Sequence, residues 1–305
     1  MSDPLSQAKS TFKAHARTFS LAARFLPRQR YDAVARLYAF CRELDDLADA
    51  GPAGINHDQL LGIRQDICCG ESRDLAVQDM LALQQQFSIP TTLVVDFIDT
   101  LIEDQYPRQL QSVDDLVRFA YGVASTVGLM MCHIFGVHDK RALPFAVDLG
   151  VAMQMSNVAR DILEDAERGR IYIPADLTPG QVTCRGLLDA DQIQRQRAYT
   201  GATRLLGIAD EYYASASMGY GYLPRAVRHA IKVAARLYQA IGDKIVANPQ
   251  DYWQQRTVIP ADQKCWLIAD LFVQRLREGS STQFIGKVEH PRYLHQALDS
   301  RRFTA

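Results

Sequence analysis

The sequence predicts an all-α protein, and three features support that prediction. Apolar residues recur mostly at spacings of three and four along the 305-residue chain, which is the period of an amphipathic helix. Alternating apolar and polar runs, the pattern of a strand, are scarce. Glycine and proline fall between long segments, where helices end and begin. The length suits one large domain or two small ones, and the absence of a low-complexity linker favours one.

Helical periodicity divides the chain into an ordered series of segments. The predicted helices cover residues 5–24, 29–50, 57–70, 74–87, 91–104, 113–136, 140–165, 189–216, 223–247 and 261–277. Prolines stand near the beginnings of four of them, where the ring is tolerated because no helical amide is lost. Residues 166–188 break the period, so we expect a loop there that closes over a site. Residues 1–284 are therefore predicted to form one helical domain, followed by a basic and aromatic tail at 285–305.

Composition excludes several classes of protein. Hydrophobic residues make up 48% and charged residues 23% of the chain, which is close to the average for a globular protein and unlike a disordered chain, a collagen or a disulfide scaffold. The formal net charge is −1, and no block of like charge suggests a nucleic-acid partner. The six cysteines lack paired C-x-x-C spacing, which favours a reducing compartment and argues against a zinc site.

The expected location is the cytoplasm, with peripheral contact at the inner face of the membrane as a further hypothesis. The N-terminal residues lack a hydrophobic signal core, and we find no uninterrupted apolar run of about 18 residues. The tail contains basic and aromatic residues that could dock on anionic lipid, although a solvated tail is the simpler interpretation. They are Lys287, Arg292, Tyr293, Arg301, Arg302 and Phe303.

The first informative motif lies in the segment LYAFCRELDDLAD, residues 37–49. Asp45 and Asp49 are four residues apart, so they share one face of a helix. At about 100° per residue, Asp45 falls inside an apolar arc and Asp49 lies near its edge. The arc is formed by Val34, Leu37, Tyr38, Cys41, Leu44 and Ala48. We therefore expect this pair to face inward, whereas Asp46 points well away from the arc.

A second pair of carboxylates, Asp161 and Asp165, has the same spacing. Along the predicted helix, Gln154 shares their side and Asn157 lies at its margin, next to Val147, Val151 and Val158. Like charges at this spacing destabilise a helix, and burying a carboxylate costs several kcal/mol unless another group compensates its charge. A single pair is usually a solvated acidic face, but two pairs on inward faces indicate a bound cation.

The ligand types narrow the choice of ion and substrate. Carboxylate oxygens suit Mg²⁺, with Mn²⁺ as the alternative, and Mg²⁺ characteristically joins a few carboxylates to substrate phosphates. Guanidinium groups beside the motifs can pair with phosphate oxygens. They belong to Arg42, Arg160, Arg168 and Arg170. Each arginine alone is typical of a surface ion pair, but together they favour a substrate that carries a phosphate or diphosphate.

Residues 121–131, YGVASTVGLMM, place small residues and two glycines inside an otherwise apolar helix. Glycine there costs up to about 1 kcal/mol relative to alanine. Its presence indicates a kink, the close approach of a ligand, or tight packing between helices. The sequence leaves these alternatives open.

Together these motifs resemble those of the squalene and phytoene synthase family, the head-to-head prenyl synthases. The resemblance runs from about His15 to Cys265. It is carried by HARTFSLAARFLP, YAFCRELDDLAD, YGVASTVGLM, QMSNVARDILEDAERGRIYIP, YYASASMGYGYLP and AIKVAARLYQAIGDKI. The family resemblance implies an isoprenoid-synthase helical bundle whose central cavity holds two prenyl diphosphates. The chain departs from the family at Ser125, where glycine is common, and at Ala16, where some relatives carry a hydroxyl.

The resemblance also implies roles for individual residues. The implied metal ligands are Asp45, Asp49, Asn157, Asp161 and Asp165. The implied diphosphate-binding residues are Arg17, Thr18, Arg42, Gln154, Asn157, Arg160, Tyr238 and Arg256. Tyr121 matches a cavity tyrosine near the reacting carbons, and we group it with the four aspartates as the implied catalytic residues.

The implied reaction belongs to carotenoid biosynthesis, since the motifs most resemble those of bacterial members of the family that make phytoene. In it, two geranylgeranyl diphosphates condense with Mg²⁺ through a cyclopropylcarbinyl diphosphate, and no NADPH is expected. A C30 synthase that makes dehydrosqualene, hydroxysqualene or squalene from farnesyl diphosphate is the enzyme alternative. A noncatalytic homologue that serves in assembly is the alternative of another class. A terpene cyclase is a weaker match, because it usually has one aspartate-rich motif and an Asn/Ser/Glu triad.

Overall fold

The computed structural model describes residues 4–278 and 289–298 and confirms the all-α prediction. Its α-helices are α1 (Pro4–His15), α2 (Arg17–Ala23), α3 (Arg28–Asp49), α4 (His57–Cys69), α5 (Leu75–Phe87), α6 (Thr91–Asp104), α7 (Val113–Ala120), α8 (Thr126–Phe135), α9 (Leu143–Arg160), α10 (Ile162–Glu167), α11 (Cys184–Leu188), α12 (Gln192–Met218), α13 (Arg225–Ala247) and α14 (Ala261–Glu278). Two short strands, β1 (Arg108–Gln109) and β2 (Arg170–Ile171), pair in parallel with Arg108 opposite Arg170.

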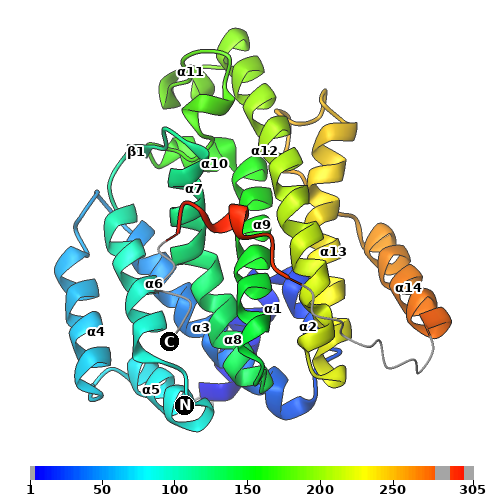
Figure 1. Ribbon diagram of the computed structural model, residues 1–305. Helices are drawn as coiled ribbons and strands as arrows, with labels where there is room; N and C mark the ends of the chain where they lie inside the picture. The colour runs from blue at the N-terminus through cyan, green and yellow to red at the C-terminus, as the bar shows by residue number, and fades with distance from the viewer. Residues whose placement is uncertain (1–3, 279–288, 299–305) are drawn as a thin grey trace.

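Helix α9 runs through the middle of the molecule (Figure 1) and packs against α7, α8, α12 and α13. Apolar residues such as Val147, Val151 and Met155 of α9 are fully buried there. A second apolar cluster joins α3, α5, α6 and α8 through residues such as Leu37, Met80 and Ile98. The two clusters meet along α8 and α9, so polar residues on the inner faces of α3 and α9 are held by rigid helices.

Two of the predicted helices are interrupted. The segment predicted at 5–24 divides at Ala16 into α1 and α2. The segment predicted at 140–165 begins with a 3-10 turn at Lys140–Ala142 and divides again at Asp161, whose φ of −103° and ψ of 22° leave the helical range. The Tyr252 hydroxyl donates to the carbonyl oxygen of Ala159 at 2.5 Å, which supports the end of α9 from outside the helix. Periodicity alone does not detect such tertiary contacts.

The prediction of a plain loop at 166–188 was wrong. This segment holds β2, a 3-10 turn at Ala175–Leu177 and α11. The hydroxyl of Thr183 accepts a hydrogen bond from the amide of Gly186 at 3.1 Å and caps α11. Strand β2 is two residues long, so it has no alternation that a sequence pattern could reveal.

The glycine-bearing helix is explained by helix packing and by a change of helix type. Residues Tyr121–Ser125 form a π-helical turn between α7 and α8, a feature that bends helices and is frequent at functional sites. A Cβ at Gly122 would collide with Thr100 of α6, and a Cβ at Gly150 would collide with Ser125. Ser125 is therefore accommodated by a glycine on α9, and its hydroxyl donates to the Val147 carbonyl at 2.8 Å.

The continuous stretch Val113–Phe135 is long and apolar enough to cross a membrane by length and composition. We did not expect such a stretch, because polar residues interrupt its apolar run. Within the described structure 61% of its most apolar window is buried, where it forms the contacts of α7 and α8 with α6 and α9. These contacts are those of a core helix.

Candidate active site

The first acidic pair projects from the last turns of α3. The side chains of Asp45 and Asp49 are 47% and 26% exposed. The protein around Asp45 removes part of its hydration, and the nearby charge of Asp49 disfavours a second negative charge. Both effects raise the pKa of Asp45, to about 6. The Arg42 guanidinium donates to Asp45 at 3.1 Å and lowers that pKa in part. The pair therefore carries an excess of negative charge.

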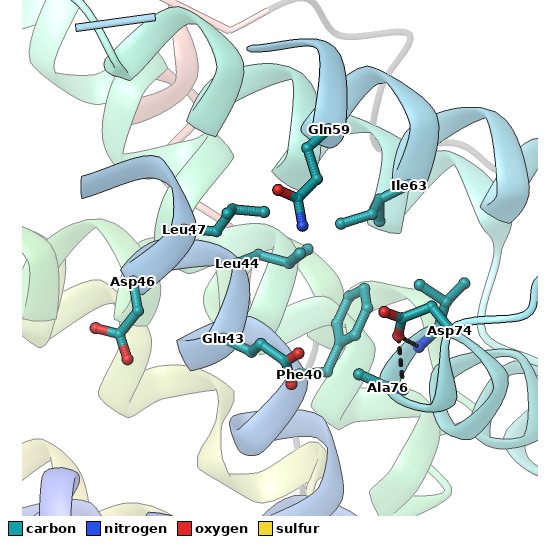
Figure 2. Close-up of a pocket in the computed structure, with 10 residues that line it drawn as sticks. Phe40, Glu43, Leu44, Asp46, Leu47, Gln59, Ile63, Asp74 and Ala76 are labelled. Atoms are coloured by element: carbon teal, nitrogen blue, oxygen red, sulfur yellow. Dashed lines mark hydrogen bonds between the residues drawn. The ribbon is translucent and has the colours of Figure 1, made fainter. Parts of the chain in front are cut away.

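Asp46 lies on another face of α3, as its position in the sequence predicted. Figure 2 shows it at the edge of a cavity of about 260 Å³ between α3, α4 and α5, which Glu43 and Asp74 also line. The Arg42 guanidinium pairs with both Asp45 and Asp46. Because this cavity lies on the other side of α3 from Asp45 and Asp49, we do not assign the reaction to it.

The second acidic pair stands at the break between α9 and α10. Arg160 donates to both oxygens of Asp161 at 2.7 and 2.5 Å, and Arg256 donates to the same two oxygens at 2.8 and 3.0 Å. Burial opposes ionisation of Asp161, but these two guanidinium groups lower its pKa below the usual range. Among the described residues no arginine pairs with Asp165 in this way, and burial together with Asp161 and Asp104 raises its pKa well above the usual value.

Two arginines that follow the second motif in the chain reach the first motif. Arg170 follows Asp165 on strand β2 and is 8% exposed, and its Nη1 lies 2.6 Å from Oδ1 of Asp49 on α3. Arg168 lies 3.4 Å from the other oxygen of Asp49. The segment that follows the second aspartate pair therefore contacts the first pair, and the pairing of β2 with β1 fixes Arg170 there.

Two members of this network were not predicted from the sequence. Asp104, at the end of α6, is 7% exposed, and it accepts a hydrogen bond from the Tyr172 hydroxyl at 2.6 Å. Nη1 of Arg170 lies 3.7 Å from Asp104, and burial raises the pKa of this carboxyl to about 6. Asp104 continues the buried face of Val94, Ile98 and Leu101, so helical periodicity could have identified it. Tyr172 carried no such signal, because β2 and the residues after it are too short for a pattern.

The predicted polar companions on α9 and α13 lie beside the second motif. The Asn157 side-chain amide donates to Gln154 at 3.3 Å, while its Oδ1 atom is buried and has no hydrogen-bond partner among the described residues. Tyr238 is partly buried on α13, where it interacts electrostatically with Arg160, Asp161 and Arg256. An oxygen in the position of Asn157 Oδ1 is suited to bind a cation.

Three further predicted residues have different outcomes. Tyr121 is 2% exposed at the start of the π-helical turn and belongs to the core cluster around α9. The backbones of Arg17 and Thr18 begin α2, which packs against α13. Their side chains lie outside the described part of the structure, so their predicted contacts with diphosphate stay predictions.

The site combines an excess of carboxylates with arginines placed around its edge. Asp45, Asp104 and Asp165 all have raised pKa values, which means that the site favours the addition of positive charge. The donor set consists of carboxylate oxygens and one amide oxygen, the set that divalent Mg²⁺ and Mn²⁺ prefer. The residues present therefore fit a hard divalent cation that binds an anionic substrate.

Comparison with known proteins gives one consistent result. The model of a family described as squalene/phytoene synthase matches residues 12–263. A 15-cis-phytoene synthase from Paracoccus sp. is 32% identical over 268 residues, which cover 84% of this chain and 86% of the relative. A 15-cis-phytoene synthase from Enterobacter agglomerans is 33% identical, with 83% and 90% covered.

Solved structures of similar fold include a dehydrosqualene synthase and a squalene synthase from Alicyclobacillus acidocaldarius. The first has a TM-score of 0.75 at 22% identity and covers 90% of this chain and 96% of that protein. The second has a TM-score of 0.67 at 24% identity and covers 80% and 93%. At these identities the two structures show the shared helical fold.

Proposed function

This chain belongs to the squalene/phytoene synthase family, and from that premise we propose that it is a phytoene synthase that joins two geranylgeranyl diphosphates head to head. The observation that carries the proposal is that Arg170, five residues after Asp165, pairs with Asp49 of the first motif, while the charge of Asp104 contributes to the raised pKa values of both Asp45 and Asp165. The choice of a C40 product is supported by relatives at 32% and 33% identity that are named 15-cis-phytoene synthase.

The basic residues of the site are proposed to bind the diphosphate groups. Arg42, Arg160 and Arg256 now pair with aspartates. Arg160 and Arg256 each donate to both oxygens of Asp161, and guanidinium groups bind phosphate oxygens in the same bidentate way. Each of the three arginines can therefore release its aspartate and bind a substrate oxygen. Tyr238 is placed among Arg160, Asp161 and Arg256, where its hydroxyl can donate to the departing diphosphate.

The aspartates are proposed to hold Mg²⁺, with Mn²⁺ as a substitute. The metal ligands in this proposal are Asp45, Asp49, Asn157, Asp161 and Asp165. When bound, the cation supplies Lewis-acid stabilisation of the negative charge that develops on a leaving diphosphate. The arginines then hold that diphosphate away from the carbocation, and the apolar residues of α8 and α9 limit the access of water.

The proposed reaction has two parts. Carbon 1 of one chain, freed by loss of diphosphate, bonds to the carbon-2/carbon-3 double bond of the other, and loss of a proton from carbon 1 closes the ring of a cyclopropylcarbinyl diphosphate. Loss of the second diphosphate and rearrangement follow, and loss of a proton completes phytoene, so no hydride from NADPH is required. We propose that the buried Tyr121 stabilises the second carbocation through its ring and hydroxyl. In that role, Tyr121→Phe would consume substrate and accumulate the cyclopropyl intermediate, whereas normal phytoene yield would limit Tyr121 to packing.

We also propose a cytoplasmic location in peripheral contact with the inner face of the membrane, because substrate and product are both highly apolar. Of the tail residues named above, Arg292 and Tyr293 lie in the described segment, and Tyr293 is 58% exposed. Lys287, Arg301, Arg302 and Phe303 lie outside the described residues. Replacement of Arg292, Arg301 and Arg302 by glutamine should weaken binding to anionic vesicles at low salt, and unchanged binding would exclude the tail as the anchor.

Product analysis tests the proposed function. The purified chain is incubated with Mg²⁺ and either geranylgeranyl or farnesyl diphosphate, with and without NADPH, and the hydrocarbon is identified by mass. We expect phytoene from geranylgeranyl diphosphate, in equal yield with and without NADPH, and loss of product in the control Asp49→Asn. A C30 hydrocarbon from farnesyl diphosphate as the main product would make the chain a C30 synthase. Absence of diphosphate release from both substrates would support a noncatalytic protein.

A further inference from the structure

The segment at residues 289–298 lies across α9 and α12, far along the chain from the elements that it contacts. In Figure 1 it crosses in front of α9. The Tyr212 hydroxyl on α12 donates to the Leu294 carbonyl at 2.7 Å, and Leu294 is 6% exposed in the core around α9. Arg118 of α7 donates to the Ala297 carbonyl at 3.4 Å. These contacts fix the segment in place without the help of its histidines.

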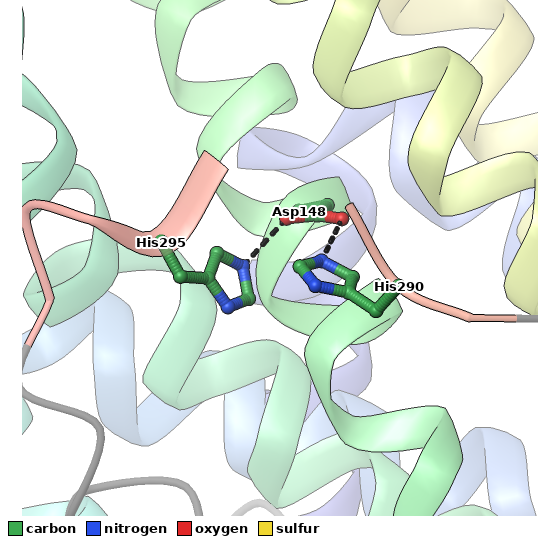
Figure 3. Close-up of side chains that lie close together, drawn as sticks. All are labelled: Asp148, His290 and His295. Carbon is green, nitrogen blue, oxygen red and sulfur yellow. Dashed lines mark hydrogen bonds and ion pairs between the residues drawn. The ribbon is translucent and has the colours of Figure 1, made fainter. Parts of the chain in front are cut away.

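Two histidines of this segment converge on one buried carboxylate (Figure 3). Nε2 of His290 lies 2.8 Å from Oδ2 of Asp148, and Nε2 of His295 lies 2.7 Å from Oδ1. The side chain of Asp148 on α9 is fully buried, and the two histidine side chains are 11% and 12% exposed. The Ser215 hydroxyl of α12 also donates to Asp148, at 2.5 Å.

The donor set of this cluster differs from that of the aspartate site. Two imidazole nitrogens and one carboxylate oxygen lie within 4.8 Å of one another. Such nitrogen-rich sets suit Zn²⁺ and neighbouring transition ions, whereas all-oxygen sets suit Mg²⁺. The two histidines are five residues apart, which falls within the spacing common in zinc sites.

The cluster is also separate from the proposed active site. Asp148 and Asn157 are nine residues apart on α9, which corresponds to about 13 Å along a helix. The imidazole rings of His290 and His295 lie 4.2 Å apart, and the ring of His290 also contacts Phe145 at 5.3 Å. An ion here would therefore lie about 13 Å along α9 from the proposed diphosphate site.

We propose that Asp148, His290 and His295 bind one transition-metal ion, Zn²⁺ in preference to Mg²⁺, which fastens the C-terminal segment to α9. Each Nε2 atom ligates as a free base, so its hydrogen moves to Nδ1 or leaves with solvent as the ion enters. Ser215 then orients Asp148, as outer hydrogen-bond partners do at other metal sites. The role of the ion is structural, since binding to the folded chain alone stabilises that fold.

The experiment uses the full chain, stripped with chelator and returned to millimolar Mg²⁺, which occupies the aspartate site. Co²⁺ serves as the spectroscopic probe and Zn²⁺ as the calorimetric one. Cys68 and Cys69 are exposed and adjacent, so both are replaced by serine in every sample to remove a competing thiolate site. The test variants are His290→Gln and His295→Gln, and His57→Gln on α4 is the matched control.

We expect one equivalent of Co²⁺ with visible bands of nitrogen ligation, and one equivalent of Zn²⁺ that raises the Tm. Each test variant should weaken Zn²⁺ binding by more than about 100-fold, because loss of even an outer partner weakens metal sites about 10- to 100-fold. The control should bind as the parent does. Absence of stoichiometric binding in the folded parent, or equal binding by parent and test variants, would overturn the proposal and leave a hydrogen-bonded contact. Both readouts are independent of prenyl transfer.

Discussion

The two aspartate pairs have the same spacing but different surroundings. Asp45 and Asp49 stand on one unbroken helix, and the arginines on Asp49 come from strand β2 and the turn before it. Asp161 stands at a helix break, and two bidentate arginines hold it. Burial and Asp49 raise the pKa of Asp45 to about 6, whereas Arg160 and Arg256 lower the pKa of Asp161 against the effect of burial.

This difference suggests a division of work between the pairs. Asp161 is ionised and is paired with Arg160 and Arg256. These two arginines can move from Asp161 to the diphosphate when the substrate binds. Asp45 and Asp165, whose pKa values are raised, gain most from a divalent cation. Equal spacing in sequence therefore does not imply equal electrostatic roles.

Substitution within either pair has the largest expected effect. Asp45→Asn, Asp49→Asn, Asp161→Asn and Asp165→Asn should each leave a folded helical protein and lower turnover by about 100-fold or more, as loss of one charge-stabilising group does in other enzymes. Steady-state diphosphate release measures this effect. Asp46→Asn, which faces the cavity between α3, α4 and α5, is the control and should retain activity within a few-fold. Near-normal turnover in any two test variants at low Mg²⁺ would contradict the metal assignment.

Removal of Arg170, which pairs with Asp49 and Asp104, should reduce stability next most strongly. Arg170→Met leaves Asp49 and Asp104 without their buried cation, and breaking such a pair costs about 3 kcal/mol of unfolding free energy or more. Urea unfolding at neutral pH measures the loss, and added Mg²⁺ should recover part of it. Arg168→Met is the matched control, because Arg168 is 47% exposed and exposed pairs contribute up to about 1 kcal/mol. Equal losses in the two variants would show that burial of Arg170 is not the cause.

The pH dependence of metal binding should reveal the contribution of Asp45. The pKa of Asp45 is about 6, so this ligand is increasingly protonated as pH falls through 6, and protonation competes with the cation. Mn²⁺ affinity measured without diphosphate should therefore fall steeply between pH 7 and pH 5, by up to about tenfold per pH unit for one proton. Asp45→Asn should make that profile less steep, and the raised pKa of Asp165 accounts for the pH dependence that remains. Affinity that is constant over this range would contradict the assignment of Asp45 as a ligand.

The hydroxyl of Tyr172 should have the smallest effect of these four. Tyr172→Phe removes its 2.6 Å hydrogen bond to Asp104 but keeps the ring stacked on Phe119 at 4.6 Å. A loss of about 1.5 to 3 kcal/mol in unfolding free energy is expected for a buried hydrogen bond to a charged group. Tyr106→Phe is a suitable control, since Tyr106 is 45% exposed and such surface changes fall within about 0.5 kcal/mol. Identical urea curves for both variants would remove Tyr172 from the network.

Much of the fold was predictable because most helices show their apolar face directly in the sequence. Asp45 and Asp49 could be placed on an inward face by helical geometry alone, and Asp104 could have been found in the same way. The break at Asp161 could not, because it depends on Arg256 and Tyr252, which lie about 90 residues further along the chain. The partners of Arg170 could not be predicted either. The position of Arg170 depends on the pairing of a two-residue strand, which is too short to show a pattern in the sequence.

The claim that both aspartate pairs form one metal and diphosphate site is tested most directly by Mn²⁺ binding in the presence of inorganic diphosphate. Paramagnetic resonance can count the bound ions in the unmodified chain, in Asp49→Asn and in Asp165→Asn. If the two pairs form one site, each substitution should abolish the Mn²⁺ binding that depends on diphosphate and should weaken diphosphate binding, although the two residues belong to different motifs. A variant that binds both Mn²⁺ and diphosphate as the unmodified chain does would contradict this claim.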